Sequence, residues 1–261
     1  MLELCTLASG SSGNCLLVTD GRTHLLVDAG ISCRRICTGL KALSIDPAQL
    51  AGILITHEHS DHIAGLETLT KRFPVPLFAT VGTVQQLCHR LPSVADRMRT
   101  LPKQPFSVGS MTVASFPTPH DNCDSVGYTI SSGGRKAAVV TDLGRVTPEV
   151  AAGIWGAHLL VGETNHEVAW VEDGPYPRNL KRRILGDYGH LSNEAGAALA
   201  CTAVKGGART VLLAHLSREN NTPQRAYETV SAQLTQMGAK VGRDVTLEVA
   251  PRSELSRRYL V

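Results

Sequence analysis

A short histidine-rich segment carries the clearest chemical signal in this chain. His57, His59, Asp61 and His62 form the pattern His-x-His-x-Asp-His. Neutral imidazoles and a carboxylate suit zinc, manganese, iron or nickel, and the absence of cysteine from the segment argues against a structural zinc site made of thiolates. The segment therefore predicts a catalytic metal centre. The alternative is a solvated loop that is histidine-rich by chance, which four specified positions at this spacing disfavour.

Further metal-capable residues stand alone, each at the carboxyl end of an apolar run that is typical of a strand. They are His120 after residues 111–116, Asp142 after 136–141 and His215 after 210–214. A lone histidine in such a place is more often structural, but a rigid strand end is also where a scaffold presents ligands. The first cluster likewise follows an apolar run, at 53–56. We therefore expect these residues to join it and to provide for two ions.

The rest of the chain alternates short apolar runs with amphipathic helical patterns, and this order predicts two sheets covered by helices. Asp20-Gly21 indicates a hairpin, while Ser32, Asp46 and Thr222 are expected helix N-caps. The expected strands cover residues 2–7, 15–19, 24–28, 53–56, 77–80, 111–116, 126–131, 136–141, 158–162, 210–214 and 245–249. The expected helices cover residues 32–43, 63–73, 83–91, 147–153, 178–186, 193–204 and 222–237, with a short one after Asp46-Pro47.

The order of the metal-capable residues, with Asp28 before them, resembles the metallo-β-lactamase superfamily of hydrolases. This resemblance implies an α/β protein with the four-layer αββα fold, in which two mixed sheets pack face to face with helices outside. It also implies one hydrolase domain over residues 1–261, because the stretch from Asp142 to His215 is too short for a β-CASP cap. By the same resemblance, one ion is held by His57, His59 and His120, and the second by Asp61, His62 and His215. Asp142 bridges the two ions, and Asp28 orients the cluster.

Several longer segments resemble the WalJ (YycJ)-like branch, which is similar to DNA exonucleases. They are Ala8-Ser9-Gly10-Ser11-Ser12-Gly13-Asn14, Glu163-Thr164-Asn165-His166, Gly189-His190-Leu191-Ser192-Asn193, and the stretch from His215 to Pro223. Class B lactamases typically carry a cysteine where Asp142 stands, so the resemblance speaks against β-lactam hydrolysis. Asn122-Cys123 departs from the expected pattern and alters the edge of the pocket.

The predicted metals suggest how the reaction would run. Two divalent ions that share a bridging water generate hydroxide at neutral pH, and this hydroxide is the natural nucleophile for a phosphodiester. Asp61 or Asp142 can steer it. His190 is the first candidate to protonate the leaving oxygen and His166 the second, although either can instead be an ordinary surface histidine.

Other residues are expected to bind phosphate. Ser192 or Asn193 caps the helix over 193–204, and a helix N-terminus attracts phosphate. The basic segment before it, which includes Arg182, would follow the phosphate backbone, unless it is only a solvated face. Further expected contacts come from Ser12 and Asn14, in a loop that a plain hairpin turn explains equally well, and from Asn220.

These features favour a metal-dependent DNA exonuclease in DNA repair or processing, with zinc or manganese as cofactor, iron or nickel as further options, and a single strand or a DNA end as substrate. A net charge of only +3 and an aromatic content of 4% keep a second hypothesis open. It is a small-molecule hydrolase, such as a thioesterase, lactonase, β-lactamase-like enzyme or cyclic-phosphate diesterase. A non-catalytic metal-binding module is a third.

Composition also bears on location. The chain has no run of eighteen apolar residues and no basic segment before its first apolar stretch, so we expect neither a membrane span nor a signal peptide. Its seven cysteines are scattered and include no Cys-x-x-Cys, which favours free thiols in a reducing compartment. We therefore expect a cytoplasmic protein.

Overall fold

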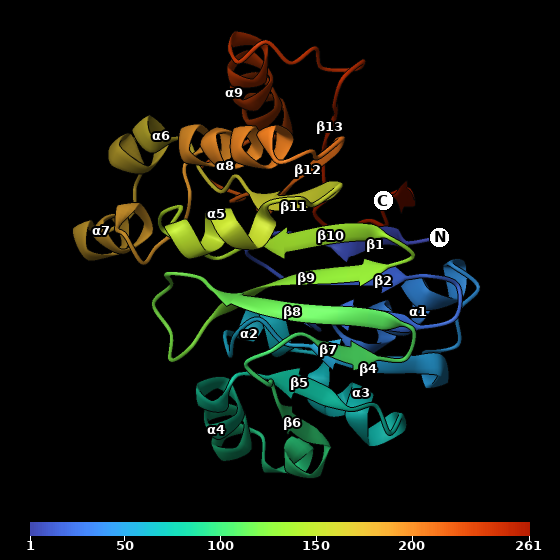
Figure 1. The fold of residues 1–261 in the computed structure, drawn as a ribbon. Helices are drawn as coiled ribbons and strands as arrows, with labels where there is room; N and C mark the ends of the chain where they lie inside the picture. Colours follow the sequence, from blue (N-terminus) through green and yellow to red (C-terminus); the bar gives the residue numbers. More distant parts are fainter.

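The computed structural model describes residues 1–261, and its strands form two sheets of seven strands each (Figure 1). The first sheet contains β1 (Glu3–Ala8), β2 (Cys15–Thr19), β3 (His24–Val27), β4 (Leu50–Leu54), β5 (Leu77–Ala79), β6 (Met98–Thr100) and β14 (Tyr259–Leu260). The second contains β7 (Phe106–Val108), β8 (Met111–Pro117), β9 (Val126–Ser132), β10 (Arg135–Val140), β11 (Leu159–Glu163), β12 (Thr210–Ala214) and β13 (Thr246–Val249). Both sheets are mixed: the strands from β3 to β6 and from β10 to β13 are parallel, and the others are antiparallel.

Helices cover the outer surfaces of both sheets. They are α1 (Cys33–Ala42), α2 (Ser60–Ile63), α3 (Leu66–Arg72), α4 (Val81–Arg90), α5 (Pro148–Ile154), α6 (Val168–Asp173), α7 (Arg178–Leu185), α8 (Asn193–Lys205) and α9 (Pro223–Gln236), with the short 3₁₀ helices η1 (Pro47–Gln49) and η2 (Pro92–Arg97). None of them has the length and hydropathy that a membrane-spanning helix requires.

Three hydrophobic clusters separate the layers. The central cluster joins side chains of both sheets, such as Leu25 of β3 and Val139 of β10. One outer cluster packs the first sheet, including Leu26, against α1 and α3, and the other packs the second sheet against α5, α8 and α9. Neighbouring residues such as Leu25 and Leu26 therefore face different cores, which is why the strands are apolar on both faces. This arrangement confirms the four-layer αββα fold.

Most expected elements are present within a few residues of their predicted bounds. β2 and β12 begin and end where predicted, and the side chains of Ser32, Asp46 and Thr222 accept hydrogen bonds from the first turns of α1, η1 and α9. The Asp20-Gly21 hairpin joins β2 to β3 in antiparallel pairing. The elements that the sequence analysis missed are short: β6, β7, β14, η2 and α6.

The expected helix over 63–73 is wrong in its bounds. It begins earlier, at Ser60, and is divided into α2 and α3 at Gly65. The chain is crowded here, since a Cβ on Gly65 would lie 2.1 Å from the carbonyl oxygen of Ile31. The early start places Asp61 and His62 in a helical turn, so that both side chains belong to a rigid element instead of a loop.

Strands β3 and β12 lead directly to a residue with left-handed backbone, and β10 does so after one intervening residue. Asp28, Asp142 and His215 have φ angles of 60°, 60° and 57°. Asp and His are among the non-glycine residues that enter this region more often than others. The turn of the backbone ends each strand abruptly and brings these side chains to the end of the molecule where β4 enters the histidine cluster.

Candidate metal centre

The first group of donor atoms comes from His57, His59 and His120, and their ligand atoms lie within 4.8 Å of one another. His57 is fully buried, and its Nε2 has no hydrogen-bond partner. His120 Nδ1 lies 3.0 Å from the carbonyl oxygen of Gly189, which directs Nε2 toward His59 Nδ1, 3.3 Å away. Two imidazole nitrogens that face each other at this distance, next to a third without a partner, form a site that suits a cation.

The second group consists of Asp61, His62 and His215. Asp61 Oδ2 lies 3.4 Å from His62 Nε2 and 3.5 Å from His215 Nε2. Both histidines are buried, and His215 Nε2 lacks a hydrogen-bond partner. The side chain of Asp61 is 23% exposed, so this carboxylate is the part of the group that solvent reaches.

Asp142 lies between the two groups. Its Oδ2 is 3.2 Å from His62 Nε2 yet has no partner with hydrogen-bond geometry, and its Oδ1 is 3.4 Å from His215 Nε2 and 3.8 Å from His120 Nε2. A buried carboxylate whose two oxygens face different imidazoles can bind an ion on each side. The structure thus brings together all the residues that the sequence analysis assigned to the metals. Two further donor groups overlap with these, one of His57, His62 and Asp142 and the other of Asp142, Glu163, His190 and His215.

Asp28 supports this centre from behind. Its Oδ2 lies 2.7 Å from His62 Nδ1, and its Oδ1 accepts a hydrogen bond from the backbone N–H of Thr56 at 2.8 Å. Burial would lower the pKa of His62, but the carboxylates of Asp142 and Asp28 raise it well above its usual value. The position agrees with the expected orienting role, and the concentrated negative charge favours divalent cations.

One carboxylate of the site, Glu163 at the end of β11, appears in the sequence only as part of the segment Glu163-Thr164-Asn165-His166 and was given no role there. It is fully buried, and its Oε1 lies 2.9 Å from His215 Nδ1 and 2.8 Å from His190 Nδ1. Burial would raise the pKa of Glu163, but the two histidines hold it at about 2. Its place at a strand end, which was decisive for His120, was the signal that could have identified it.

The two candidate proton donors, His190 and His166, differ sharply in their exposure to solvent. The side chain of His190 is 19% exposed, its ring lies 5.2 Å from that of His120 and 5.3 Å from that of His215, and Glu163 occupies its Nδ1. His166 is 1% exposed, and burial lowers its pKa to about 4. An enclosed, neutral imidazole is poorly suited to donate a proton, and His166 is not a surface histidine either. His166 Nδ1 also lacks a hydrogen-bond partner but is buried, so of the two candidates only His190 can present a ring nitrogen, Nε2, to a substrate.

Two of the expected phosphate contacts have structural partners instead. Asn193 is buried, and its amide exchanges hydrogen bonds with the amide of Asn221 at 3.1 and 2.8 Å. Asn14 is also buried: its Oδ1 accepts from Gly10 N, and its Nδ2 lies 3.1 Å from His62 Nε2. Their polar atoms are already used, so these asparagines hold the loops around the metal centre in place.

The remaining candidates vary in exposure. Ser12 and Arg182 are exposed, whereas Asn220 is buried. Ser192 caps α8, as expected, with its Oγ 3.1 Å from Ala195 N. Asn220 is held through its backbone by Ser217 and Glu167, so it is poorly placed for a ligand.

A cleft of ≈ 240 Å³ adjoins His190. Sequence reasoning did not anticipate its aromatic residue, Tyr176, or its second arginine, Arg218. The full lining comprises Ser11, Asn165, Tyr176, Leu180, Arg183, Ile184, His190, Ser217, Arg218 and Glu219. This cleft connects the basic helix α7 with the metal centre.

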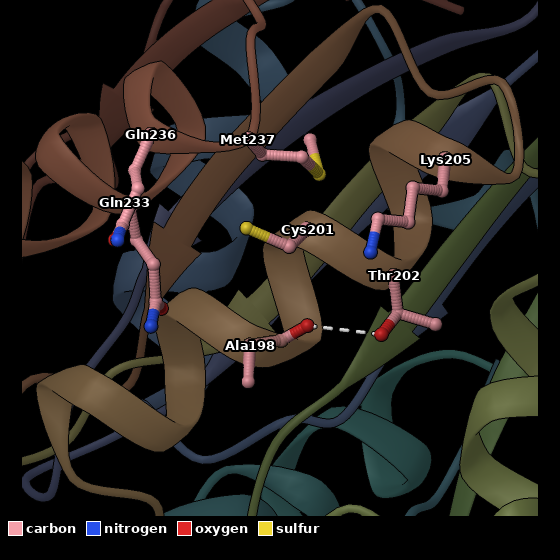
Figure 2. Close-up of a pocket in the computed structure, with 7 residues that line it drawn as sticks. All are labelled: Ala198, Cys201, Thr202, Lys205, Gln233, Gln236 and Met237. Atoms are coloured by element: carbon pink, nitrogen blue, oxygen red, sulfur yellow. Dashed lines mark hydrogen bonds between the residues drawn. The ribbon is translucent and has the colours of Figure 1, made fainter.

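A larger hollow of ≈ 430 Å³ lies elsewhere, between α8 and α9 (Figure 2). Its lining includes Cys201, Lys205 and Met237, and the hydrogen bond drawn there joins Thr202 Oγ1 to Ala198 O, one turn back in the same helix. None of the metal-capable groups lines it. The chemistry of the molecule is therefore concentrated at the strand ends.

Comparison with known proteins agrees with this geometry. The family model described as "Beta-lactamase superfamily domain" matches residues 23–216, which include every residue of the two donor groups. The exodeoxyribonuclease YycJ of Bacillus anthracis is 36% identical over 247 residues, covering 92% of both chains. The exodeoxyribonuclease WalJ of Streptococcus pneumoniae is 35% identical over 244 residues, covering 91% of this chain and 90% of that protein.

A solved structure shows the same fold at low identity. The metallo-β-lactamase fold protein YhfI from Bacillus subtilis superposes with a TM-score of 0.73 at 16% identity, covering 98% of this chain and 100% of its own. At this identity the match establishes the arrangement of the layers only.

Proposed function

The chain belongs to the beta-lactamase superfamily, and from this premise we propose that it is an exodeoxyribonuclease that depends on two divalent metal ions. One observation carries the proposal: the carboxylate of Asp142 faces histidines of both groups of three donors, in a chain that is 36% identical to an exodeoxyribonuclease over 92% of both lengths. The same residues would be expected in any hydrolase of the family, so the DNA substrate rests on the relatives and on the basic surface beside the site.

The donor set fits divalent ions, because His57 Nε2, His215 Nε2 and Asp142 Oδ2 are buried without hydrogen-bond partners. In our proposal, one ion would be held by His57, His59 and His120 and the other by Asp61, His62 and His215, and Asp142 would serve both. Zinc and manganese suit these ligands. Such ions lower the pKa of a shared water and neutralise charge on a phosphodiester.

The surrounding residues would divide the remaining tasks. Asp61, the one carboxylate of the second group and 23% exposed, orients the attacking water. His190, held by Glu163 through Nδ1, donates a proton from Nε2 to the leaving oxygen. Asp28 and Glu163 position the imidazoles of His62 and His215 and do not touch the substrate.

The direct test uses purified protein with manganese or zinc and end-labelled single- and double-stranded DNA. We expect stepwise, metal-dependent shortening from an end, and we expect Asp61→Ala and His62→Ala to abolish it. His89→Ala is the matched control, because His89 is exposed on α4 and belongs to neither donor group. Internal cleavage of a circular strand would contradict exonuclease action.

The small size of the cleft favours a second candidate, a hydrolase of small esters, thioesters or cyclic phosphates. Turnover of such a substrate by a protein that binds two metal ions but leaves DNA intact would support it and overturn the nuclease proposal.

We further propose that residues 1–261 act as one hydrolase domain without a cap insertion and that the protein is cytoplasmic. The first sheet includes both β1 and β14, from opposite parts of the sequence, which supports a single unit. All seven cysteines are free thiols, as expected in a reducing compartment.

A further inference from the structure

Helix α7 has an apolar face that is not buried in a core. None of its residues is buried, although an amphipathic helix normally packs its apolar side against the rest of the protein. Leu180 and Ile184 instead line the cleft beside His190, together with Tyr176, which precedes the helix. In Figure 1, α6 and α7 lie at the left, at the end of the molecule toward which β10 runs. The apolar wall therefore borders an open space next to the metal centre.

This wall is rigidly connected to the donor groups. The backbone N–H of His190 donates a hydrogen bond to Ile184 O at 3.0 Å. The carbonyl oxygen of Gly189 lies 3.0 Å from Nδ1 of His120, one of the donor residues of the first group. A Cβ on Gly189 would lie 2.2 Å from the carbonyl oxygens of Arg183 and Ile184, so only glycine fits this turn. A ligand that rests on α7 is consequently held at a fixed position relative to His190.

The rim of the cleft is charged. Arg218 is 80% exposed, and its nearest acidic partner, Glu219, lies 3.9 Å away and is 65% exposed, so the pair is weak. Arg183 pairs with Asp121 on the side of His120. An apolar wall with arginines at its rim complements a ligand that has a flat apolar part and a phosphate, as a nucleotide does.

The volume of ≈ 240 Å³ is below the ~300–1,000 Å³ of most small-molecule pockets, which limits the occupant to about one nucleotide. We propose that this cleft holds the terminal nucleotide of a DNA strand, with its base against Tyr176, Leu180 and Ile184 and its phosphate beside Arg218. The proposal rests on the proposed exonuclease function and adds to it a physical reason for starting at an end.

The test compares two oligonucleotides, one intact and one in which the terminal nucleotide at the digested end lacks its base. Each carries its label at the far end. Stacking of a base on an aromatic side chain corresponds to about a 5- to 150-fold effect, so we expect the missing base to lower kcat/KM of the wild type by about tenfold or more. A base removed several nucleotides further in should have little effect.

Tyr176→Ala should reduce this preference for an intact terminal base to less than about threefold, because the stacking surface is gone. Leu180→Ala should reduce it in the same direction. Tyr227→Ala and Leu185→Ala are the matched controls: both residues are exposed and neither lines the cleft, so the preference should be unchanged. The preference is a ratio within each variant, and circular dichroism and metal content establish that each variant is folded.

The outcomes separate the two proposals. If the wild type degrades both oligonucleotides at the same rate, or if Tyr176→Ala keeps the full preference, the cleft is not the terminal-nucleotide site, while the exonuclease function stands. If the wild type degrades no DNA with either metal, both proposals are overturned.

Discussion

Most of the imidazoles in the metal centre have their second nitrogen occupied. A ring nitrogen that is engaged by a neighbouring oxygen sets the tautomer and the orientation of the other nitrogen. The exception is His59: its Nδ1 faces the Nε2 of another ligand histidine, His120, and no neighbouring oxygen fixes the orientation of its ring through a hydrogen bond. The pairs are His57 with Thr56, His62 with Asp28, His120 with the Gly189 carbonyl, and His215 with Glu163.

Asp28→Asn should test this orienting role without altering the backbone, because asparagine tolerates the left-handed φ of 60° as well as aspartate does. Loss of a carboxylate behind a ligand histidine typically costs about 10- to 100-fold in metal affinity or activity. We expect a loss of that size in metal titrations and in hydrolysis. Unchanged affinity in the folded variant would mean that Asp28 is only a turn residue.

His190→Ala should lower hydrolysis of DNA by about 10²- to 10⁴-fold, the usual contribution of a general acid. A nitrophenyl ester of thymidine phosphate should be affected much less, because nitrophenolate leaves without a proton. The two substrates are compared in the same variant, with the exposed His89→Ala as the control. Equal losses on both substrates would show that His190 acts in binding or support and not as the acid.

At the scale of elements, the sequence predicts what apolar periodicity can reveal. β2 and β12 were predicted to the residue because each is a run of five apolar or β-branched residues bounded by polar ones. β6, β7 and β14 have two or three residues, which is too short for a period to register. The division of the 63–73 helix depends on how closely Ile31 approaches Gly65, a tertiary contact that no local pattern contains.

Within the site, too, local sequence patterns reveal some residues, whereas others depend on tertiary contacts. The metal-capable residues were found because their types are chemically specific and follow strands. Glu163 was given no role in the site because a single glutamate after a strand has many ordinary explanations. The pairing of the Asn193 amide could not be predicted, because its partner, Asn221, is distant in the sequence and only the fold brings the two amides together.

The hairpin turn at Asp20 offers a prediction about stability. Its Oδ2 lies 2.5 Å from Ser110 Oγ and 2.9 Å from Ser132 Oγ, so this turn of the first sheet is tied to the second. Burial would raise the pKa of Asp20, but these hydroxyls and the N–H groups of the turn lower it. A carboxylate whose pKa is lowered by folding stabilises the fold at any pH above the pKa of the unfolded carboxyl, which is about 3.9. The stabilisation is lost as the pH falls from that value through the pKa of the folded carboxyl.

Asp20→Asn should therefore lower the melting temperature at pH 7 by about 2–4 °C, equivalent to about 1 kcal/mol for this largely solvent-exposed network. The difference from the wild type should shrink as the pH falls below about 4, because the unfolded chain then binds a proton that the folded Asp20 carboxylate still excludes. Asp173→Asn is the control, since Asp173 is exposed at the end of α6. A deficit that is constant from pH 7 to pH 3 would exclude the charge as its cause.

At the scale of the molecule, the metal centre lies on the seam between the two sheets. Asp28 and the 57–62 cluster follow strands of the first sheet, whereas His120, Asp142, Glu163 and His215 follow or end strands of the second. An ion in either position would thus join the two halves of the fold, directly or through Asp142.

Metal binding should for this reason stabilise the whole protein. Free metal at 1,000 times its Kd contributes about 4 kcal/mol, which corresponds to a rise of roughly 8–16 °C in melting temperature for a chain of this size. Thermal unfolding of the chelator-treated protein, before and after addition of manganese or zinc, measures the effect. His62→Ala should show a much smaller rise, and a wild type that melts at the same temperature with and without metal would argue against a stable site.

The left-handed backbone at Asp28, Asp142 and His215 has a consequence for evolutionary drift. Most side chains are strained at such φ angles by about 1–2 kcal/mol, whereas glycine and asparagine are tolerated. In a saturation library, glycine and asparagine at these positions should therefore keep cellular abundance while activity is abolished at Asp142 and His215 and lowered at Asp28, by about 10- to 100-fold for asparagine there. Valine, isoleucine and threonine should lose both abundance and activity. Inactive descendants of this protein would then be recognisable by asparagine or glycine at the three strand ends, long after the chemistry had been lost.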